Sequence, residues 1–146
     1  MTNPEQVLND AVEVVFNRLQ DRGYASMNDA QRNILCVWSA CGEVDNGGFE
    51  QYYFNDSGDW AVDTPQAFEA VGAPDLARIV STANALFPAG CPSRSAAMRQ
   101  QELEALSPSA LRKLEKLSAE FDSTIIDPLL TNYVQQHALD LFASPA

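Results

Sequence analysis

The chain has 146 residues, of which 46% are hydrophobic, and this length and composition predict a single domain over residues 1–146. Its formal net charge of −11 argues against direct binding to nucleic acid or to an anionic membrane, because both would be repelled. The sequence shows no signal-peptide pattern and no apolar run of about 18 residues, and its three cysteines fit a reducing compartment, so we expect a cytoplasmic protein.

The predicted elements, in chain order, are all helices. A capping residue followed by proline, as in Asn3-Pro4 and Ser107-Pro108, favours a helix start, and glycine favours a stop. Apolar residues recur at helical spacing between these signals, and no alternating strand pattern is found. The predicted helices run from Pro4 to Gly23, Asp29 to Gly47, Phe49 to Asn55, Thr64 to Gly72, Pro74 to Phe87, Ser95 to Leu106, Ser107 to Phe121 and Asp127 to Leu141. The sequence therefore predicts an all-α fold, a compact domain of about seven or eight helices.

Few side chains suggest catalysis. His137, the only histidine, lies on the predicted inner face of the last helix, where a structural role is more common than a catalytic one. Cys91 lies in a predicted loop without neighbours that favour a thiolate. The segment from Glu43 to Phe54 has some features of a calcium loop, but Phe54 cannot supply the closing carboxylate. We therefore predict no enzyme, no catalytic residue, no metal site and no cofactor.

Residues 33–77 form an acidic block with no lysine or arginine. The block carries −8 of the net charge of −11, and a surface of one sign attracts basic proteins by long-range steering. Its carboxylates are Glu43, Asp45, Glu50, Asp56, Asp59, Asp63, Glu69 and Asp75.

Three of these carboxylates have a local explanation. Asp63 and Asp75 lie at predicted helix starts, where they complement the helix dipole, and Asp56 lies in a predicted turn. We keep Asp56 and Asp63 as lesser candidates for partner contact. The main candidates, which lack a local explanation, are Glu43, Asp45, Glu50, Asp59 and Glu69. General acidity, for solubility or in a salt-adapted host, explains the block almost equally well.

A motif lies inside the acidic block and shorter matches follow it, namely Asp45-Asn46-Gly47-Gly48-Phe49-Glu50-Gln51-Tyr52-Tyr53-Phe54-Asn55, then Gly72-Ala73, Phe87-Pro88, Leu129-Leu130, Tyr133 and His137. In this order they resemble a family of small acidic bacterial proteins named after a DNA-mimic protein, over about residues 28–140. The resemblance implies an all-helical fold and a homodimer. In the best-understood member it implies a carboxylate surface that imitates duplex DNA and occupies the DNA-binding face of a transcription factor.

We interpret the motif itself as structural. Gly47-Gly48 permits a sharp reversal through positive φ, and Phe49, Tyr52 and Tyr53 can fill the core. The Gln51 and Asn55 amides can cap helix ends or satisfy buried backbone groups, and Asn46 is counted among the structural residues of the motif.

The leading hypothesis is a non-enzymatic protein that binds a basic protein, such as a transcription factor or another DNA-binding protein, by imitating the charge of DNA. One alternative is a small ligand-binding protein or enzyme with a polar cleft near Gln51, Tyr53, Asn55 and His137. Another is a structural dimer with a salt-adapted acidic surface, in which the apolar face of the last helix meets its twin.

Overall fold

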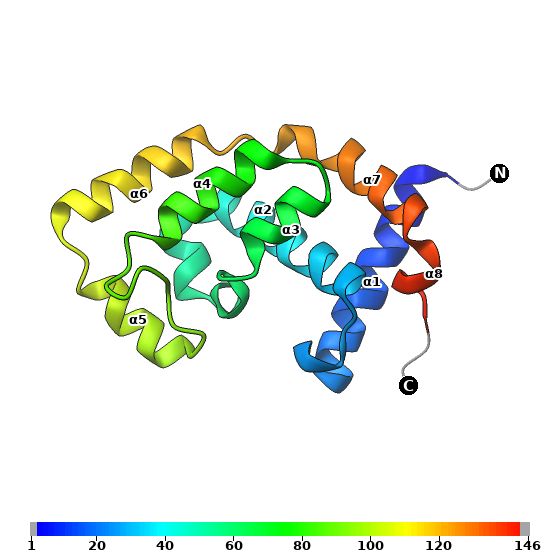
Figure 1. Ribbon diagram of the computed structural model, residues 1–146, viewed down its shortest axis with the longest axis horizontal. Coiled ribbons are helices and arrows are strands. Elements are labelled where there is room, and N and C mark those ends of the chain that lie inside the picture. Colours follow the sequence, from blue (N-terminus) through cyan, green and yellow to red (C-terminus); the bar gives the residue numbers. More distant parts are fainter. Residues whose placement is uncertain (1–2, 144–146) are drawn as a thin grey trace.

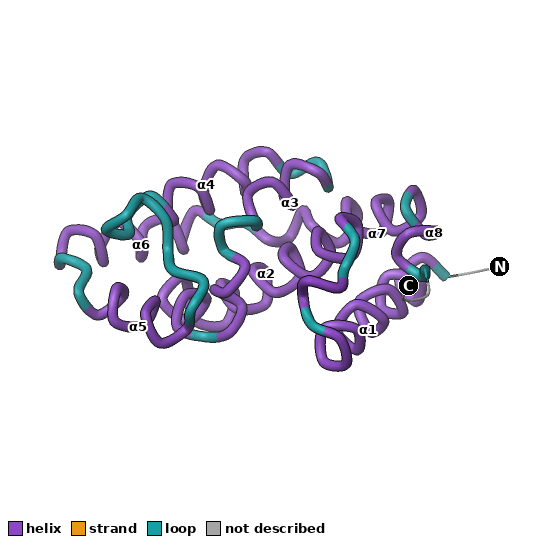
Figure 2. Tube along the Cα trace, turned by 60° about the horizontal axis from the view of Figure 1, so that its bottom comes forward, coloured by secondary structure: helices purple, strands orange, loops and turns teal. Residues whose placement is uncertain are grey.

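The computed structural model describes residues 3–143, and every regular element in that range is a helix (Figures 1 and 2). The α-helices are α1 (Pro4–Arg22), α2 (Asp29–Phe54), α3 (Thr64–Ala70), α4 (Pro74–Asn84), α5 (Ala96–Glu104), α6 (Pro108–Glu120), α7 (Ile126–Gln136) and α8 (Ala138–Leu141). Three short 3-10 helices connect them, η1 (Tyr24–Ser26), η2 (Asp56–Trp60) and η3 (Ser123–Ile125). The all-α prediction is confirmed. None of the described helices is long and apolar enough to cross a membrane.

Local capping explains where several helices begin. The Asn3 side chain accepts a hydrogen bond from the backbone N–H of Glu5, and Pro4 occupies the first turn of α1. Asn28 and Gln31 form a reciprocal capping box at the start of α2. The last predicted helix differs from the structure, because His137 has non-helical dihedral angles (φ −118°, ψ 21°) and separates α7 from α8.

Helix α2 is the central element, with the others arranged along it (Figure 1). It packs against α1, α3, α5 and α6, while α7 packs against α1. Helices α1, α7 and α8 lie at one end of the molecule and α5 and α6 lie at the other (Figure 1). The core between them is apolar, with fully buried side chains that include Val15, Ile34, Phe68, Leu114 and Leu130.

The two glycines of the motif bend α2. Gly48 has φ +73° and ψ −175°, a conformation that is essentially restricted to glycine. The Ser118 hydroxyl on α6 accepts a hydrogen bond from the backbone N–H of Phe49 (2.9 Å) and donates one to the carbonyl of Leu114 (2.9 Å). The predicted break at Gly47-Gly48 is therefore present as a kink, and α6 supplies the partner for the helix turn that follows it.

The aromatic residues of the motif lie in the core, as expected. Phe49, Tyr52 and Tyr53 have no exposed surface. The Tyr53 hydroxyl donates to Oδ1 of Asn84 (2.7 Å), and the Tyr52 hydroxyl lies 2.9 Å from Oγ1 of Thr64. Buried hydroxyls need such partners, so both tyrosines are satisfied where they lie.

A fully buried arginine joins α5 to the end of α2. The Arg99 guanidinium donates to the carbonyls of Tyr53 (2.6 Å), Asn55 (2.9 Å) and Ser93 (3.0 Å). One of its nitrogens also lies 2.9 Å from a carboxylate oxygen of Asp59. Several acceptors therefore converge on one buried charge, which stabilises the turn after α2.

Candidate functional site

The polar side chains of the motif converge on Glu43. The Gln51 amide (2.8 Å) and the Asn55 amide (2.9 Å) both donate to Oε2 of this carboxylate, and the Asn46 amide donates to Oε1 of Gln51 (3.2 Å). The prediction that the Gln51 and Asn55 amides cap helix ends or bind backbone groups is therefore wrong. The kink at Gly47 places both amides beside the preceding turns of α2, where the Glu43 carboxylate is a stronger acceptor than a carbonyl.

Glu43 lines a groove between α1, α2, η2 and α5, with a volume of about 590 Å³. We call it the tryptophan groove, because Trp38 and Trp60 both line it. It shares Trp38 and Gly42 with a second groove, and Phe54 and Asn55 with a third. The three grooves therefore adjoin one another.

These three adjoining grooves, called here the acidic band, are lined by negatively charged side chains and by no positively charged one among residues 3–143. Among the described residues that line its three grooves there is no lysine, arginine or histidine. Its carboxylates are Glu43, Asp45, Glu50, Asp56 and Asp127. The structure thus brings together four of the predicted contact residues and adds Asp127, the first residue of the last predicted helix.

The carboxylates of the acidic band are open to solvent. Asp45, Glu50, Asp56 and Asp127 are exposed, and Glu43 is half-buried. The Ser123 hydroxyl donates to Asp45 (2.6 Å), whereas Glu50 and Asp56 have no side-chain partner within residues 3–143. The band therefore carries negative charge that no side chain of the described residues neutralises.

The other predicted contact residues lie apart from the acidic band. Asp59 is paired with Arg99, as described above, and Glu69 is exposed on α3. The two terminal guanidinium nitrogens of Arg94 donate to Asp63 (3.0 Å each), and the Tyr24 hydroxyl adds a third hydrogen bond (2.7 Å). The hydrogen bonds from Arg94 hold the pKa of Asp63 below its usual range.

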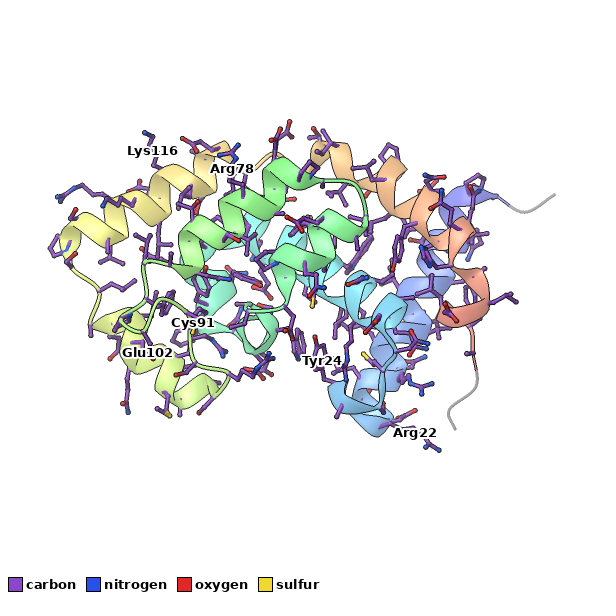
Figure 3. All side chains as sticks on the ribbon, viewed as in Figure 1. Arg22, Tyr24, Arg78, Cys91, Glu102 and Lys116 are labelled. Atoms are coloured by element: carbon purple, nitrogen blue, oxygen red, sulfur yellow. The ribbon has the colours of Figure 1, made fainter. Side chains whose placement is uncertain are left out.

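Asp63 lies in a separate pocket of about 380 Å³ that contains both signs of charge, since Arg32 and Arg94 also line it. Tyr24 of η1 also lines this pocket (Figure 3). Burial raises the pKa of the Tyr24 hydroxyl and raises that of the Cys36 thiol to about 12. Cys36 is therefore a protonated thiol at neutral pH, not a nucleophilic thiolate.

Of the four residues of the alternative polar cleft, only Gln51 and Asn55 lie together. Tyr53 is fully buried, while Gln51 and Asn55 are bonded to Glu43. His137 is half-buried and stacks on Tyr133 (4.1 Å between ring centroids) at the α7–α8 end of the molecule. Within residues 3–143 these four side chains do not meet in one pocket.

Cys91 and His137 lie at opposite ends of the molecule. Cys91 is exposed in the loop between α4 and α5 (Figure 3), whereas His137 joins α7 to α8 at the other end (Figure 1). The described part of the chain also contains no group of three or more histidine, cysteine, aspartate or glutamate residues placed to hold a metal ion.

Sequence reasoning missed the two tryptophans of the acidic band. The sequence could have pointed to them as candidate contact residues, because Trp38 and Trp60 are the only tryptophans of the chain and both lie inside the block without lysine or arginine. It also missed Arg99, whose burial depends on carbonyls more than forty residues away in the chain.

Comparison with known protein families gives one match. The family described as DMP19-like protein matches residues 25–137, which is more than half of the chain. No curated protein and no solved structure matches the chain. On the strength of the family match, the chain belongs to the DMP19-like protein family.

Proposed function

We propose that this protein is a non-enzymatic homodimer that binds a basic protein surface through the acidic band, by imitating the charge of duplex DNA. The partner is a DNA-binding protein, such as a transcription factor. The observation that carries the proposal is the composition of the acidic band: within residues 3–143, five carboxylates and no basic residue line its three adjoining grooves.

Electrostatics supports this assignment. Duplex DNA carries one negative charge per roughly 1.7 Å of axis, and proteins that bind it neutralise phosphates with lysine and arginine. A face built for that purpose is attracted by any rigid surface that presents several unneutralised anions. Glu43 is held in place by two amides and Asp45 by the Ser123 hydroxyl, so part of the acidic band is fixed before a partner arrives.

The proposal is tested by capture of partners from a cell lysate on the immobilised protein. We expect the captured proteins, identified by mass spectrometry, to be DNA-binding proteins. They should be released by high salt and by added duplex DNA, because both act on the same electrostatic contact.

Two triple variants with the same change of net charge locate the contact. Asp45→Asn, Glu50→Gln and Asp56→Asn together neutralise the exposed part of the acidic band. Their matched control replaces exposed carboxylates elsewhere, Glu13→Gln, Glu104→Gln and Glu115→Gln. Capture should be lost in the first variant and kept in the second.

Two results would overturn the proposal. One is a captured set without DNA-binding proteins, and the other is capture that the first triple variant leaves intact. Equal loss in both variants would favour general acidity, the property of a salt-adapted surface, over a specific contact.

A further inference from the structure

The tryptophan groove has aromatic walls as well as carboxylates. Its aromatic side chains are Phe16, Trp38, Phe54 and Trp60, and its carboxylates are Glu43 and Asp56. Phe54 is 52% exposed, and the two indoles are half-buried. Exposed aromatic surface rimmed by polar groups is typical of an interaction site.

The aromatic wall is ordered by packing within the chain. The Trp60 ring stacks on Tyr24, with 5.7 Å between centroids and 23° between planes. The Arg32 guanidinium carbon lies 4.7 Å from the centroid of the same Tyr24 ring. A guanidinium is thus already stacked on the aromatic row that continues into the tryptophan groove.

The carboxylates decide which occupant fits. No lysine or arginine lines the groove, and neither Glu43 nor Asp56 forms an ion pair within residues 3–143. Glu43 receives both of its amide hydrogen bonds on Oε2. An apolar occupant would remove both carboxylates from water without a counter-charge, which is costly. A cationic occupant compensates them.

We propose that the tryptophan groove binds an arginine side chain of the basic partner protein. A guanidinium is planar and weakly hydrated, so it stacks on indole while its N–H groups donate to carboxylates. A lysine ammonium is strongly hydrated and has no planar face to stack. This inference rests on the proposed function, because the partner that contacts the acidic band supplies the arginine.

Tryptophan fluorescence measures the binding directly, because both tryptophans of the chain line this groove. The probes are three short glycine–serine peptides that differ only in one central residue, arginine, lysine or citrulline. The arginine peptide should give a saturable fluorescence change. We expect binding at least about tenfold weaker for neutral citrulline, and about threefold weaker for lysine.

Substitution of Gly42 tests the groove without a change of charge. Gly42 is exposed in helical α2 and lines the groove. Apart from its own helix backbone and chain neighbours, no atom of the described residues lies within 4 Å of a Cβ added there. Gly42→Leu should therefore fold and obstruct the groove, lowering affinity for the arginine peptide at least about tenfold. Gly42→Ala is the matched control and should bind as the unmodified protein does.

A second pair of variants tests the charge. Asp56→Asn removes a carboxylate from the groove, and Glu69→Gln removes an exposed one from α3 with the same change of net charge. Only Asp56→Asn should weaken the arginine peptide by more than about threefold. This pair also decides the question if Gly42→Leu does not fold.

Several results would overturn the arginine site. They are equal affinity for the arginine and citrulline peptides, lysine binding as tightly as arginine, or equal effects of Asp56→Asn and Glu69→Gln. If capture from lysate still depends on the acidic band in that case, the proposed function stands and only the arginine site is wrong. Loss of band-dependent capture instead overturns the proposed function.

Discussion

Asp63 has other interaction partners in the structure than its position in the sequence suggested. Its position before Thr64-Pro65 suggested a carboxylate that complements a helix dipole, yet its side chain makes no capping hydrogen bond to α3. It binds instead to Arg94 and Tyr24, which lie 31 and 39 residues away in the chain. Because these partners lower its pKa, folding favours the ionised form of Asp63.

We expect Asp63→Asn to lower the free energy of unfolding at pH 7 by about 1 kcal/mol, a figure reduced for the partial exposure of the pair. Asp63 has a lowered pKa in the folded state, so its stabilising effect is fully present above its unfolded pKa of about 3.9. The effect is lost as the pH falls through the folded pKa. Urea unfolding of both proteins between pH 7 and pH 2 measures the difference.

Glu69→Gln is the control for this prediction. Glu69 is exposed and forms no ion pair in the described part of the chain, so its replacement should change the unfolding free energy by less than about 0.5 kcal/mol. A difference between Asp63→Asn and the unmodified protein that persists unchanged to pH 2 would contradict the assigned role of the carboxylate.

At the scale of elements, two of the three glycines of α2 have opposite roles. Gly42 is helical and a Cβ on it would meet open space. Gly48 has φ +73°, and a Cβ on it would lie 3.0 Å from the Ser118 hydroxyl. The same substitution at these two positions therefore separates helix propensity from backbone strain.

We expect Gly48→Ala to destabilise the protein by about 1–3 kcal/mol, because an alanine in this glycine-only region of φ/ψ is strained. Gly42→Ala should stabilise it by up to about 1 kcal/mol, because alanine loses less backbone entropy in a helix. Urea unfolding followed by circular dichroism measures both. A neutral Gly48→Ala, or a shift of the same sign in both variants, would argue against the kink as described.

A feature of an element could be predicted from the sequence when the residues that determine it lie close together along the chain. Asn3, Asn28 and Ser107 act on backbone groups two or three residues away, so the helix starts could be read from the sequence. The burial of Arg99 could not be predicted, because its acceptors on Tyr53 and Asn55 lie more than forty residues away in the chain. The break at His137 could not be predicted either, because no glycine or proline marks it. The kink is intermediate, since Gly47-Gly48 predicted the break but not its partner Ser118.

At the scale of the molecule, the acidic band depends on the arrangement of several elements. The sequence revealed the block of carboxylates without counter-charge, but positions along the chain could not show which of these carboxylates are paired with arginine and which are free to meet a partner. Folding pairs Asp59 and Asp63 with arginines that follow the block, Arg99 and Arg94. It also brings Asp127 from the start of α7 to the groove lined by Asp45. Charge sign could thus be predicted, and charge position could not.

The acidic band should also cost the protein stability. With a net charge of −11 and three ion pairs within residues 3–143, repulsion between carboxylates outweighs attraction. We therefore expect the melting temperature, followed by circular dichroism, to rise by several degrees between 10 mM and 500 mM NaCl. Screening over a Debye length that falls from about 30 Å toward a few ångström weakens the repulsion.

The triple variant Asp45→Asn, Glu50→Gln and Asp56→Asn should melt higher than the unmodified protein at 10 mM NaCl, and its melting temperature should respond less to salt. The matched triple variant at Glu13, Glu104 and Glu115 should show smaller effects, because its carboxylates come from α1, α5 and α6 and share no groove. A melting temperature that falls with added salt would mean that attraction within ion pairs outweighs repulsion between the carboxylates of the band. If the first triple variant raises the melting temperature and the matched control does not, the acidic band itself destabilises the free protein. A basic partner explains why such a band is kept, because binding of the partner relieves the repulsion.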